Sequence, residues 1–479
     1  MKMKFDIKKI IPYIIIFVLM IASFLVLFTL SSLIPKEAIE SNVKQSASQL
    51  KDEVYYADGK LLFDLGYKYE ILFPFTDAIM INEAYSIDPA DPFFSPLRAL
   101  KDYDGSGTQK IGSFDDGGNS KFIIDGNLNN GFKQIGELNS FVNGEDEFPS
   151  AYDYSRYWHG YLIWLRPALT LFDYNVLRIV ALVVTAILVF LASYLLGKYT
   201  KPIYGLFFLL SLLTVNIFIT AFSLNEIGDF ILGLLFMVIA IINYEELLDH
   251  QYKLFFIIGG LTSFFDLLTC PLITFAFPYI AFLLLEHKNS DITTKKILLE
   301  AVKLIAIWFI GFASIWAFKW ILASIALGKN IIADALNQVG TRTVTDGVTT
   351  VAQKRGLFVS IGNNLRQFSP TMIGICCLLY VAEIFALFIN SIYFKFKFDF
   401  KNNILRALPY LFVVALPFIW YMVLFEHSYI HYFFTYRYMC IAAFGIFIFI
   451  AKIFEIKDPE KQTYNKDVTN NNFEKKEQY

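Results

Sequence analysis

Long runs of apolar residues alternate with polar segments along the chain. The first run covers residues 10–34, about 25 mostly apolar positions that follow the basic start MKMKFDIKK. It is longer than the core of a cleaved signal peptide and long enough to cross a bilayer of about 30 Å, so an uncleaved first helix is expected. Further runs that could each span a membrane occur at 175–196, 203–222, 227–243, 254–268, 271–286, 303–327, 370–393, 405–425 and 437–454.

This pattern predicts an all-α polytopic membrane protein with about ten transmembrane helices and a large mixed loop after the first one. The runs at 254–268 and 271–286 lie near the lower length limit, so they are either two full spans or a re-entrant hairpin. The composition agrees with a membrane protein, because 56% of the residues are hydrophobic, only 18% are charged and the mean hydropathy is +0.50.

The lysines indicate which side of the membrane each loop occupies. With a cytoplasmic N-terminus the basic loops all fall in the cytoplasm, whereas 222–229 and 265–271 fall outside and contain no Lys or Arg. The lysines placed inside are Lys198, Lys201, Lys253, Lys288, Lys295, Lys296, Lys395, Lys397 and Lys401. We therefore expect a multi-pass protein with both termini cytoplasmic, and the abundance of Ile, Phe, Lys and Asn suggests a bacterial cell membrane.

Four regions follow from this topology. Residues 1–34 form the cytoplasmic N-terminus and first transmembrane helix, 35–172 an extracytoplasmic loop subdomain with an interfacial helix, and 173–455 the transmembrane bundle. Residues 456–479 form a polar cytoplasmic tail that is expected to be disordered. The formal net charge of -2 gives no reason to expect a nucleic-acid partner.

The subdomain at 35–172 contains the first candidate chemistry. A polar helix is expected to continue outward to Glu53, and a second short helix near 75–85 could be capped by Thr76. Asp77 would then lie in a first turn, where the helix dipole keeps a carboxylate ionised and able to act as a base. The alternative is that Asp77 only supports the cap and that Glu83 is solvated.

The segment 102–147 is rich in Gly, Asn and Asp and predicts an irregular insertion. Its start at Asp102 imitates a calcium loop, but Ser113 occupies the twelfth position, where a bidentate Glu is needed. An ordinary turn is therefore expected there.

Aromatic residues crowd the end of the subdomain, at 152–167. Tyr and Trp at this density are typical of a helix lying at the membrane interface. The same segment carries Arg156, His159 and Arg166, which could face a lipid phosphate, for which guanidinium groups are well suited. An aromatic belt without a ligand is the alternative.

The shorter outer loops add polar groups at the same depth, namely Glu226, Asp229, Asp266, His427, His431 and Arg437. His427 and His431 would share a helical face, but no HExxH or CxxC pattern supports zinc, so hydrogen bonds to phosphate or sugar are favoured over a metal. The loop 329–366 is basic and hydroxyl-rich, which suits an anionic or polyhydroxylated ligand or a solvated lid.

Two ionisable residues, Lys319 and Glu383, fall inside apolar runs and need hydrogen-bonding or charged partners or a water-filled cavity. Lys319 could meet a lipid phosphate, but snorkelling of its ammonium toward the interface is favoured. The four cysteines lie in or beside apolar runs and indicate no disulfide framework. No Walker A or dinucleotide-binding glycine motif is present, so no cofactor is expected.

The layout resembles the C-type membrane glycosyltransferases, the GT-C superfamily. The similarity covers most of the chain and rests on the first helix, the large outer loop with an acid near a short helix, the interfacial segment and the polar outer loops. It implies that a first-loop carboxylate deprotonates the acceptor, which by position is Asp77 with Glu83 in reserve. Many members place this acid closer to the first span than Asp77 lies.

The resemblance also implies a sugar donor on a polyprenyl phosphate or diphosphate, a cell-envelope acceptor and contact with membrane lipids. No Asp-X-Asp lies beside Asp77, which favours a metal-independent inverting transfer from a monophosphate. The residues expected to bind substrate or lipid phosphate are Arg156, His159, Arg166, Glu226, Asp266, His427, His431 and Arg437. The alternatives are a transporter or flippase of a lipid-linked sugar, for which no internal repeat is evident, and a ligase for an envelope polymer.

Overall fold

The computed structural model describes residues 7–53, 74–102, 133–144, 151–289, 293–343, 358–368, 370–393 and 400–455. The calcium-like fragment after Asp102 and the tail at 456–479 therefore lie outside the described residues. Within the described residues the protein is helical, apart from two three-residue strands that pair antiparallel.

The first third of the chain supplies one transmembrane helix and several short elements. These are η1 (Ile7–Lys9), α1 (Ile11–Ser32), α2 (Lys36–Glu53), α3 (Pro74–Ser86), α4 (Ser95–Arg98), β1 (Leu100–Asp102), α5 (Lys133–Val142), β2 (Ala151–Asp153) and α6 (Leu162–Leu169). The predicted polar helix after the first span is α2, and Asp77 lies in the first turn of α3 as expected. Thr76 lies within that helix rather than at its cap.

The remaining chain forms the bundle. Its elements are α7 (Tyr174–Tyr199), α8 (Pro202–Leu213), α9 (Ile217–Thr220), α10 (Leu224–Ile242), α11 (Tyr244–Leu248), α12 (Gln251–Phe265), α13 (Leu272–Asn289), α14 (Thr294–Leu327), α15 (Ile331–Arg342), α17 (Phe358–Gln367), α18 (Pro370–Tyr393), α19 (Phe400–Val423), α20 (Phe425–Ile430), α21 (Tyr432–Thr435), η4 (Tyr436–Tyr438) and α22 (Met439–Ile453).

Seven helices in the described chain are long and apolar enough to cross a membrane, so this is an all-α membrane protein. They are Ile11–Ser32, Tyr174–Tyr199, Leu224–Ile242, Thr294–Leu327, Pro370–Asn390, Lys401–Val423 and Tyr432–Ile453. The three other predicted runs contain α8, α12 and α13, which are not among these seven.

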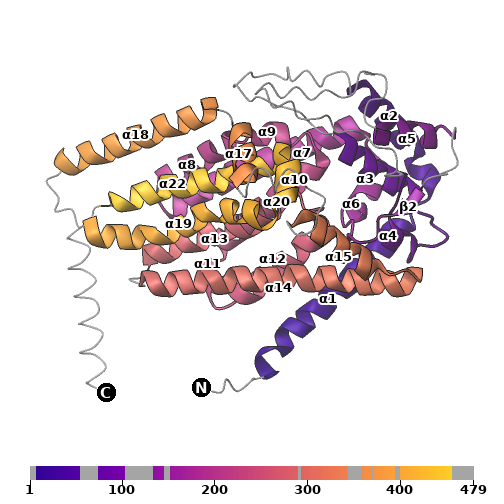
Figure 1. Ribbon diagram of the computed structural model, residues 1–479, viewed down its shortest axis with the longest axis horizontal. Coiled ribbons are helices and arrows are strands. Elements are labelled where there is room, and N and C mark those ends of the chain that lie inside the picture. The colour runs from indigo at the N-terminus through magenta and orange to yellow at the C-terminus, as the bar shows by residue number, and fades with distance from the viewer. Residues whose placement is uncertain are drawn as a thin grey trace.

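The long helices run along one axis of the molecule, and the short elements α2 to α6 gather at one end of it (Figure 1). We call this end, which also carries α15, the loop end. α12 packs against α14, α19 against α22, and α10 against both α7 and α13. α18 lies at the edge of the bundle, and its outward side chains are exposed, with Leu378 at 71%.

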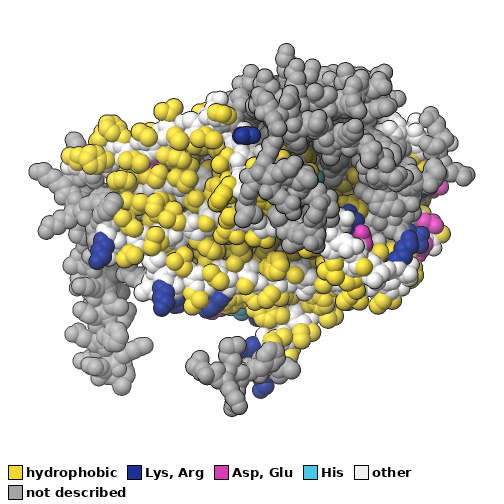
Figure 2. Space-filling model, in the orientation of Figure 1, with side chains coloured by type: hydrophobic (Ala, Val, Ile, Leu, Met, Phe, Trp, Pro, Cys, Tyr) yellow, Lys and Arg dark blue, Asp and Glu magenta, His cyan; other side chains and the backbone are white. Residues whose placement is uncertain are grey.

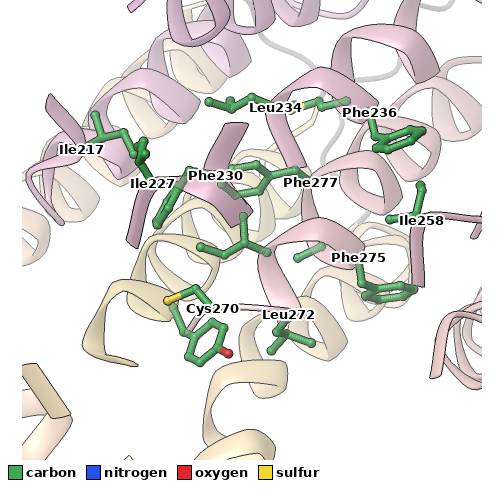
Figure 3. Packing of buried hydrophobic residues seen from close by; sticks show 14 of the residues in the cluster. Ile217, Ile227, Phe230, Leu234, Phe236, Ile258, Cys270, Leu272, Phe275 and Phe277 are labelled. Atoms are coloured by element: carbon green, nitrogen blue, oxygen red, sulfur yellow. The ribbon is translucent and has the colours of Figure 1, made fainter. Parts of the chain in front are cut away.

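The surface around the long helices is apolar, as a lipid-facing surface requires. Figure 2 shows hydrophobic side chains over the left and lower parts of this face, with charged side chains mostly near its margins. Inside the bundle, α10 and α13 interlock through Phe230 and Phe277, whose ring centroids lie 6.2 Å apart, beside buried Cys270 and Leu272 (Figure 3).

Close approach of α12 and α14 depends on two glycines. A Cβ on Gly259 would lie 1.9 Å from the carbonyl oxygen of Trp308, and a Cβ on Gly311 would lie 2.2 Å from that of Phe256. Small residues let membrane helices pack backbone to backbone, and here the contact fixes the position of the loop that follows α12.

We expect Gly259→Ala to destabilise the protein by about 1–3 kcal/mol or more, because the added methyl group overpacks a backbone contact. Gly374→Ala, in α18, is the matched control, since its Cβ would meet nothing within 4 Å. Thermal unfolding of both variants in detergent checks this prediction. Equal stability of the two variants would contradict it.

Lys319 does not snorkel. Its side chain is fully buried in α14, and its Nζ donates a hydrogen bond of 2.7 Å to the carbonyl oxygen of Leu97 at the end of α4. The same Nζ lies 5.5 Å from the ring centroid of Trp158, whose Nε1 donates to Ile315 on α14. The ammonium therefore helps to attach the subdomain to the bundle.

Candidate functional site

Most of the predicted site residues meet at the loop end of the bundle. We call Asp77, Glu226, Asp229, Asp266, Arg342, His427, His431 and Arg437 the mouth cluster. All have little exposure except Arg342, which is half-buried. They come from α3, α10, the loop after α12, α15, α20 with the residue that follows it, and η4, so distant parts of the sequence converge.

Asp77 binds the start of α10. Its Oδ2 accepts hydrogen bonds from the Tyr174 hydroxyl at 2.7 Å and the Leu224 amide at 3.0 Å, while Oδ1 accepts from the Asn225 amide at 3.0 Å. Burial raises the pKa of Asp77, whereas these donors and Arg178 oppose that rise. A carboxylate that accepts several hydrogen bonds is held in its ionised form at a helix N-terminus.

Glu226 forms a buried ion pair with Arg437. The sequence Ser223-Leu-Asn-Glu226 is a capping pattern, and the Ser223 hydroxyl accepts from the Glu226 amide at 3.3 Å. The Glu226 carboxylate instead reaches Arg437, with 2.6 Å between Oε2 and Nη1. Arg437 also donates through Nε to the Thr220 hydroxyl at 2.9 Å.

Asp229 and Asp266 form a second acidic pair, joined by a hydrogen bond between their carboxyl groups. Asp266 also accepts from the amides of Leu268 at 2.8 Å and Thr269 at 2.7 Å, and Asp229 accepts from the Cys270 amide at 2.7 Å. The pair therefore organises the loop between α12 and α13.

The histidines lie next to this loop. His427 Nε2 lies 2.8 Å from the Leu268 carbonyl oxygen and its Nδ1 lies 2.9 Å from Nη1 of Arg342. Because the carbonyl can only accept, Nε2 carries the proton and Nδ1 accepts from Arg342. The ring of His431 lies 4.8 Å from that of His427, and its buried Nδ1 has no hydrogen-bond partner among the described residues.

Sequence reasoning missed Arg342 as an individual site residue. The loop 329–366 was identified as suited to an anion, but nothing in its composition distinguished Arg342 from its other basic residues. Its place at the end of α15, against His427, results from tertiary packing. Asp229 was noted as an outer acid, but its pairing with Asp266 was not predicted.

Glu83 and His159 belong to a second group, the loop cluster, with Tyr154 and Tyr161. Glu83 Oε2 accepts from the Tyr161 hydroxyl and lies 3.0 Å from His159 Nδ1, while His159 Nε2 lies 2.8 Å from the Tyr154 carbonyl oxygen. Glu83 is fully buried rather than solvated, and its Oε1 has no hydrogen-bond partner among the described residues. The backbone of His159 is left-handed, with φ of 56°.

The two remaining arginines are engaged within the protein. Arg166 donates through Nε, Nη1 and Nη2 to the carbonyl oxygens of Ser31, Ala84 and Ile34. Burial lowers its pKa to about 10. Arg156 pairs with Asp334 on α15 at 3.3 Å. These contacts give Arg166 a structural role and leave Arg156 at the border between the two clusters.

The histidine contacts predict a pH dependence of stability. Burial, together with His431 and Arg342, lowers the pKa of His427 well below its usual value. The unfolded chain takes up this proton near pH 6.5 and the folded protein does not, so stability is full above about pH 6.5 and is lost as the pH falls below it. The limiting slope for one such group is about 1.4 kcal/mol per pH unit.

We therefore expect His427→Gln to lose less stability than the wild type between pH 6.5 and 5. Gln can still donate to the Leu268 carbonyl but does not titrate. His250→Gln is the control, because His250 is exposed and its side chain caps no helix. Unfolding midpoints measured across this range check the prediction, and parallel pH profiles for all three proteins would contradict it.

The described residues contain no group of three or more His, Cys, Asp or Glu side chains arranged to hold a metal ion. The two clusters offer carboxylates, imidazoles and guanidinium groups. Such a set can bind an anion, orient a hydroxyl group and accept a proton.

Comparison of the chain with models of known protein families, with curated proteins and with solved structures gives no match.

Proposed function

We propose that this protein is a GT-C type glycosyltransferase that moves a hexose or pentose from a polyprenyl-phosphate donor to a cell-envelope glycan or lipid. The proposal includes about ten spans in a bacterial cell membrane, both termini in the cytoplasm and the loop end on the outer face. The observation that supports it most is the meeting of acids, histidines and arginines from six separate elements in the mouth cluster.

Ionisable groups at membrane depth are costly, so their concentration at one end of the bundle favours a functional site. The mouth cluster contains positively and negatively charged side chains within hydrogen-bonding distance of each other, as in Glu226 and Arg437. A negatively charged lipid phosphate needs guanidinium and imidazole donors, and an acceptor hydroxyl needs a carboxylate. The cluster supplies both kinds of group.

In the proposed reaction the acceptor hydroxyl attacks the anomeric carbon of the sugar. Its proton passes to a carboxylate, the new glycosidic C–O bond forms, and the bond to the phosphate oxygen breaks with its electron pair leaving on the lipid phosphate. Arg342, His431 and Arg437 are assigned to stabilise that developing charge. No metal is required for this displacement.

Two carboxylates can serve as the base. Asp77 is the first assignment, and it would exchange one of its present hydrogen bonds, such as that from Tyr174, for the acceptor hydroxyl. Glu83 is the reserve, and its Oε1 has no partner among the described residues. Both residues lie on α3, six positions apart.

The alternative is a transporter or flippase of a lipid-linked sugar. The buried carboxyl of Glu383 favours this reading, because neither of its oxygens has a hydrogen-bond partner among the described residues. Alternating-access carriers place such groups along their path. A ligase for an envelope polymer would use the same mouth cluster with a different acceptor.

The test is turnover of a panel of polyprenyl-phosphate sugars by purified protein in detergent, following release of the lipid phosphate. The wild type is expected to consume at least one donor, and Asp77→Asn is expected to lower turnover by about 10²-fold or more. Asp173→Asn is the matched control, because Asp173 caps α7 through the Val176 amide and Asn caps equally well.

Three outcomes are distinguishable. Loss of turnover in Asp77→Asn alone supports transfer with Asp77 as the base, and loss in Glu83→Gln alone moves that role to Glu83. If labelled donor binds but none is consumed with any acceptor, and it crosses the bilayer of proteoliposomes, the protein is a transporter and the glycosyltransferase proposal fails.

A further inference from the structure

The hydrogen bonds of Asp229 and Asp266 in the mouth cluster limit which of the two carboxyl groups can carry a proton. Asp266 directs its two oxygens at the amides of Leu268 and Thr269, and both amides can only donate. Asp229 directs Oδ2 at the Cys270 amide, which also only donates. The hydrogen bond between the two carboxyl groups therefore needs a proton that neither backbone contact provides.

Only one arrangement satisfies every contact. If Asp266 carried the proton, one of its two oxygens would become a hydroxyl that donates to Asp229. That oxygen would then be a poor acceptor for the backbone amide that points at it. If Asp229 carries it on Oδ1, Oδ2 can still accept from Cys270, and Asp266 accepts from Asp229, from the amides of Leu268 and Thr269 and from the Thr269 hydroxyl. Two buried carboxylates in contact without a proton would repel each other.

We propose that Asp229 is the protonated member of a carboxylic acid–carboxylate pair with Asp266, and that this pair is a positioning unit for His427 and Arg342. The second half of the proposal rests on the function proposed above. Its first half, the location of the proton, stands independently of any activity.

Besides the backbone amides, the Thr269 hydroxyl also donates a hydrogen bond to Asp266. The Cys270 thiol and the Tyr438 phenol lie beside it, and both interact electrostatically with the two acids. The charged groups that also act on Cys270 are Glu226 and Arg437, which are paired with each other at 2.6 Å. The charge of Asp266 is therefore compensated by the backbone amides, by the Thr269 hydroxyl and by the proton on Asp229.

The link to the site passes through Leu268. Its backbone is left-handed, with φ of 66°, a conformation that is costly for a leucine and that the bonds from residues 268 and 269 to Asp266 maintain. In this conformation its carbonyl oxygen accepts from His427 Nε2 at 2.8 Å. That bond fixes the tautomer, so that Nδ1 is left to accept from Arg342 at 2.9 Å.

The decisive variants are Asp229→Asn and Asp266→Asn, which make the same chemical change on either side of one hydrogen bond. Asn at 229 can donate to Asp266 through its amide nitrogen and accept from Cys270 through its oxygen, so every contact survives. Asn at 266 must turn an amide group toward a backbone amide, so one contact is lost. We expect the unfolding temperature to be maintained in the first variant and lowered in the second.

Infrared difference spectroscopy locates the proton directly. A buried protonated carboxyl absorbs above the amide I band, and the difference between the wild-type and Asp229→Asn spectra at neutral pH is expected to show one such band that the variant has lost. Nitrogen-15 NMR of histidine, with His427 assigned from His427→Gln, is expected to show the Nε2-protonated tautomer in the wild type and in Asp229→Asn. It is expected to show a mixed or altered state in Asp266→Asn.

A carboxyl band that is unchanged between the wild type and Asp229→Asn overturns the proton assignment, as does a loss of stability equal to that of Asp266→Asn. An unchanged His427 tautomer in Asp266→Asn overturns the positioning role. With a donor that the wild type consumes, Asp266→Asn is expected to lower turnover at least about tenfold. If no donor is consumed, the proposed function fails while the infrared and NMR results still decide the rest.

Discussion

Replacing Arg437 with methionine is expected to destabilise the protein by about 3–5 kcal/mol, which makes it one of the most damaging single changes in the bundle. The reason is the carboxylate that remains. Glu226 is 2% exposed and pairs with Arg437 Nη1 at 2.6 Å, so without the guanidinium it would be buried with an uncompensated charge. The Thr220 hydroxyl would also lose its donor.

The double variant Glu226→Gln/Arg437→Met distinguishes the cost of losing the ion pair from the cost of leaving the Glu226 carboxylate buried without Arg437. Removing both charges is expected to recover a large part of the stability, because the neutral amide costs less to bury than an unpaired carboxylate. Unfolding of the two single variants and the double variant in detergent gives the interaction energy. Arg366→Met is the control, since Arg366 is exposed and is expected to change stability by less than about 0.5 kcal/mol.

If the single variant Arg437→Met were as stable as the control, the ion pair would contribute nothing and Arg437 would be available for another role. The same protein preparations answer a functional question. Under the proposed transfer reaction Arg437→Met also weakens binding of the lipid phosphate, whereas Arg366→Met leaves it unchanged.

Arg166→Met is expected to destabilise the protein by a similar amount, about 3–5 kcal/mol, because three carbonyl oxygens lose a charged donor together. Those carbonyls belong to Ser31 and Ile34 at the end of the first span and to Ala84 on α3. Arg166 thus connects α1, α3 and α6, and its loss is expected to loosen the subdomain that carries Asp77 and Glu83.

Limited proteolysis and thermal unfolding check this role. Arg166→Lys is the informative second variant, because it keeps the charge but lacks the guanidinium fork, and it is expected to recover less than half of the lost stability. A phosphate-binding Arg166 would give the opposite pattern, in which stability is unchanged, donor binding weakens and lysine substitutes well.

The class of protein could be predicted from the sequence because membrane insertion depends on composition over long windows. Each predicted run contains a helix in the described chain, and seven of these helices meet the requirements of length and apolarity. The short helix at Asp77 was also predictable, since a threonine and an acid near its start are local signals, although Thr76 lies within the helix rather than at its cap. Such signals need no knowledge of the neighbours in space.

The roles of individual polar residues were less predictable. Arg156 and Arg166 lie ten positions apart in the same aromatic segment, yet Arg166 donates to three carbonyls and Arg156 pairs with Asp334. Lys319 was expected at the interface and instead binds the Leu97 carbonyl in the interior. A carbonyl that needs a donor is invisible in the sequence, because every residue carries one.

The sequence by itself determined the apolar spans, the polar subdomain between the first and second of them, and the set of acids, histidines and arginines available at the loop end. These properties are local, since they depend on hydropathy and on the order of residue types. Only the tertiary structure decided which of those groups meet. The pairing of Glu226 with Arg437, of Asp229 with Asp266 and of Arg342 with His427 joins residues 37 to 211 positions apart, and helix packing rather than any sequence spacing brings such residues within hydrogen-bonding distance.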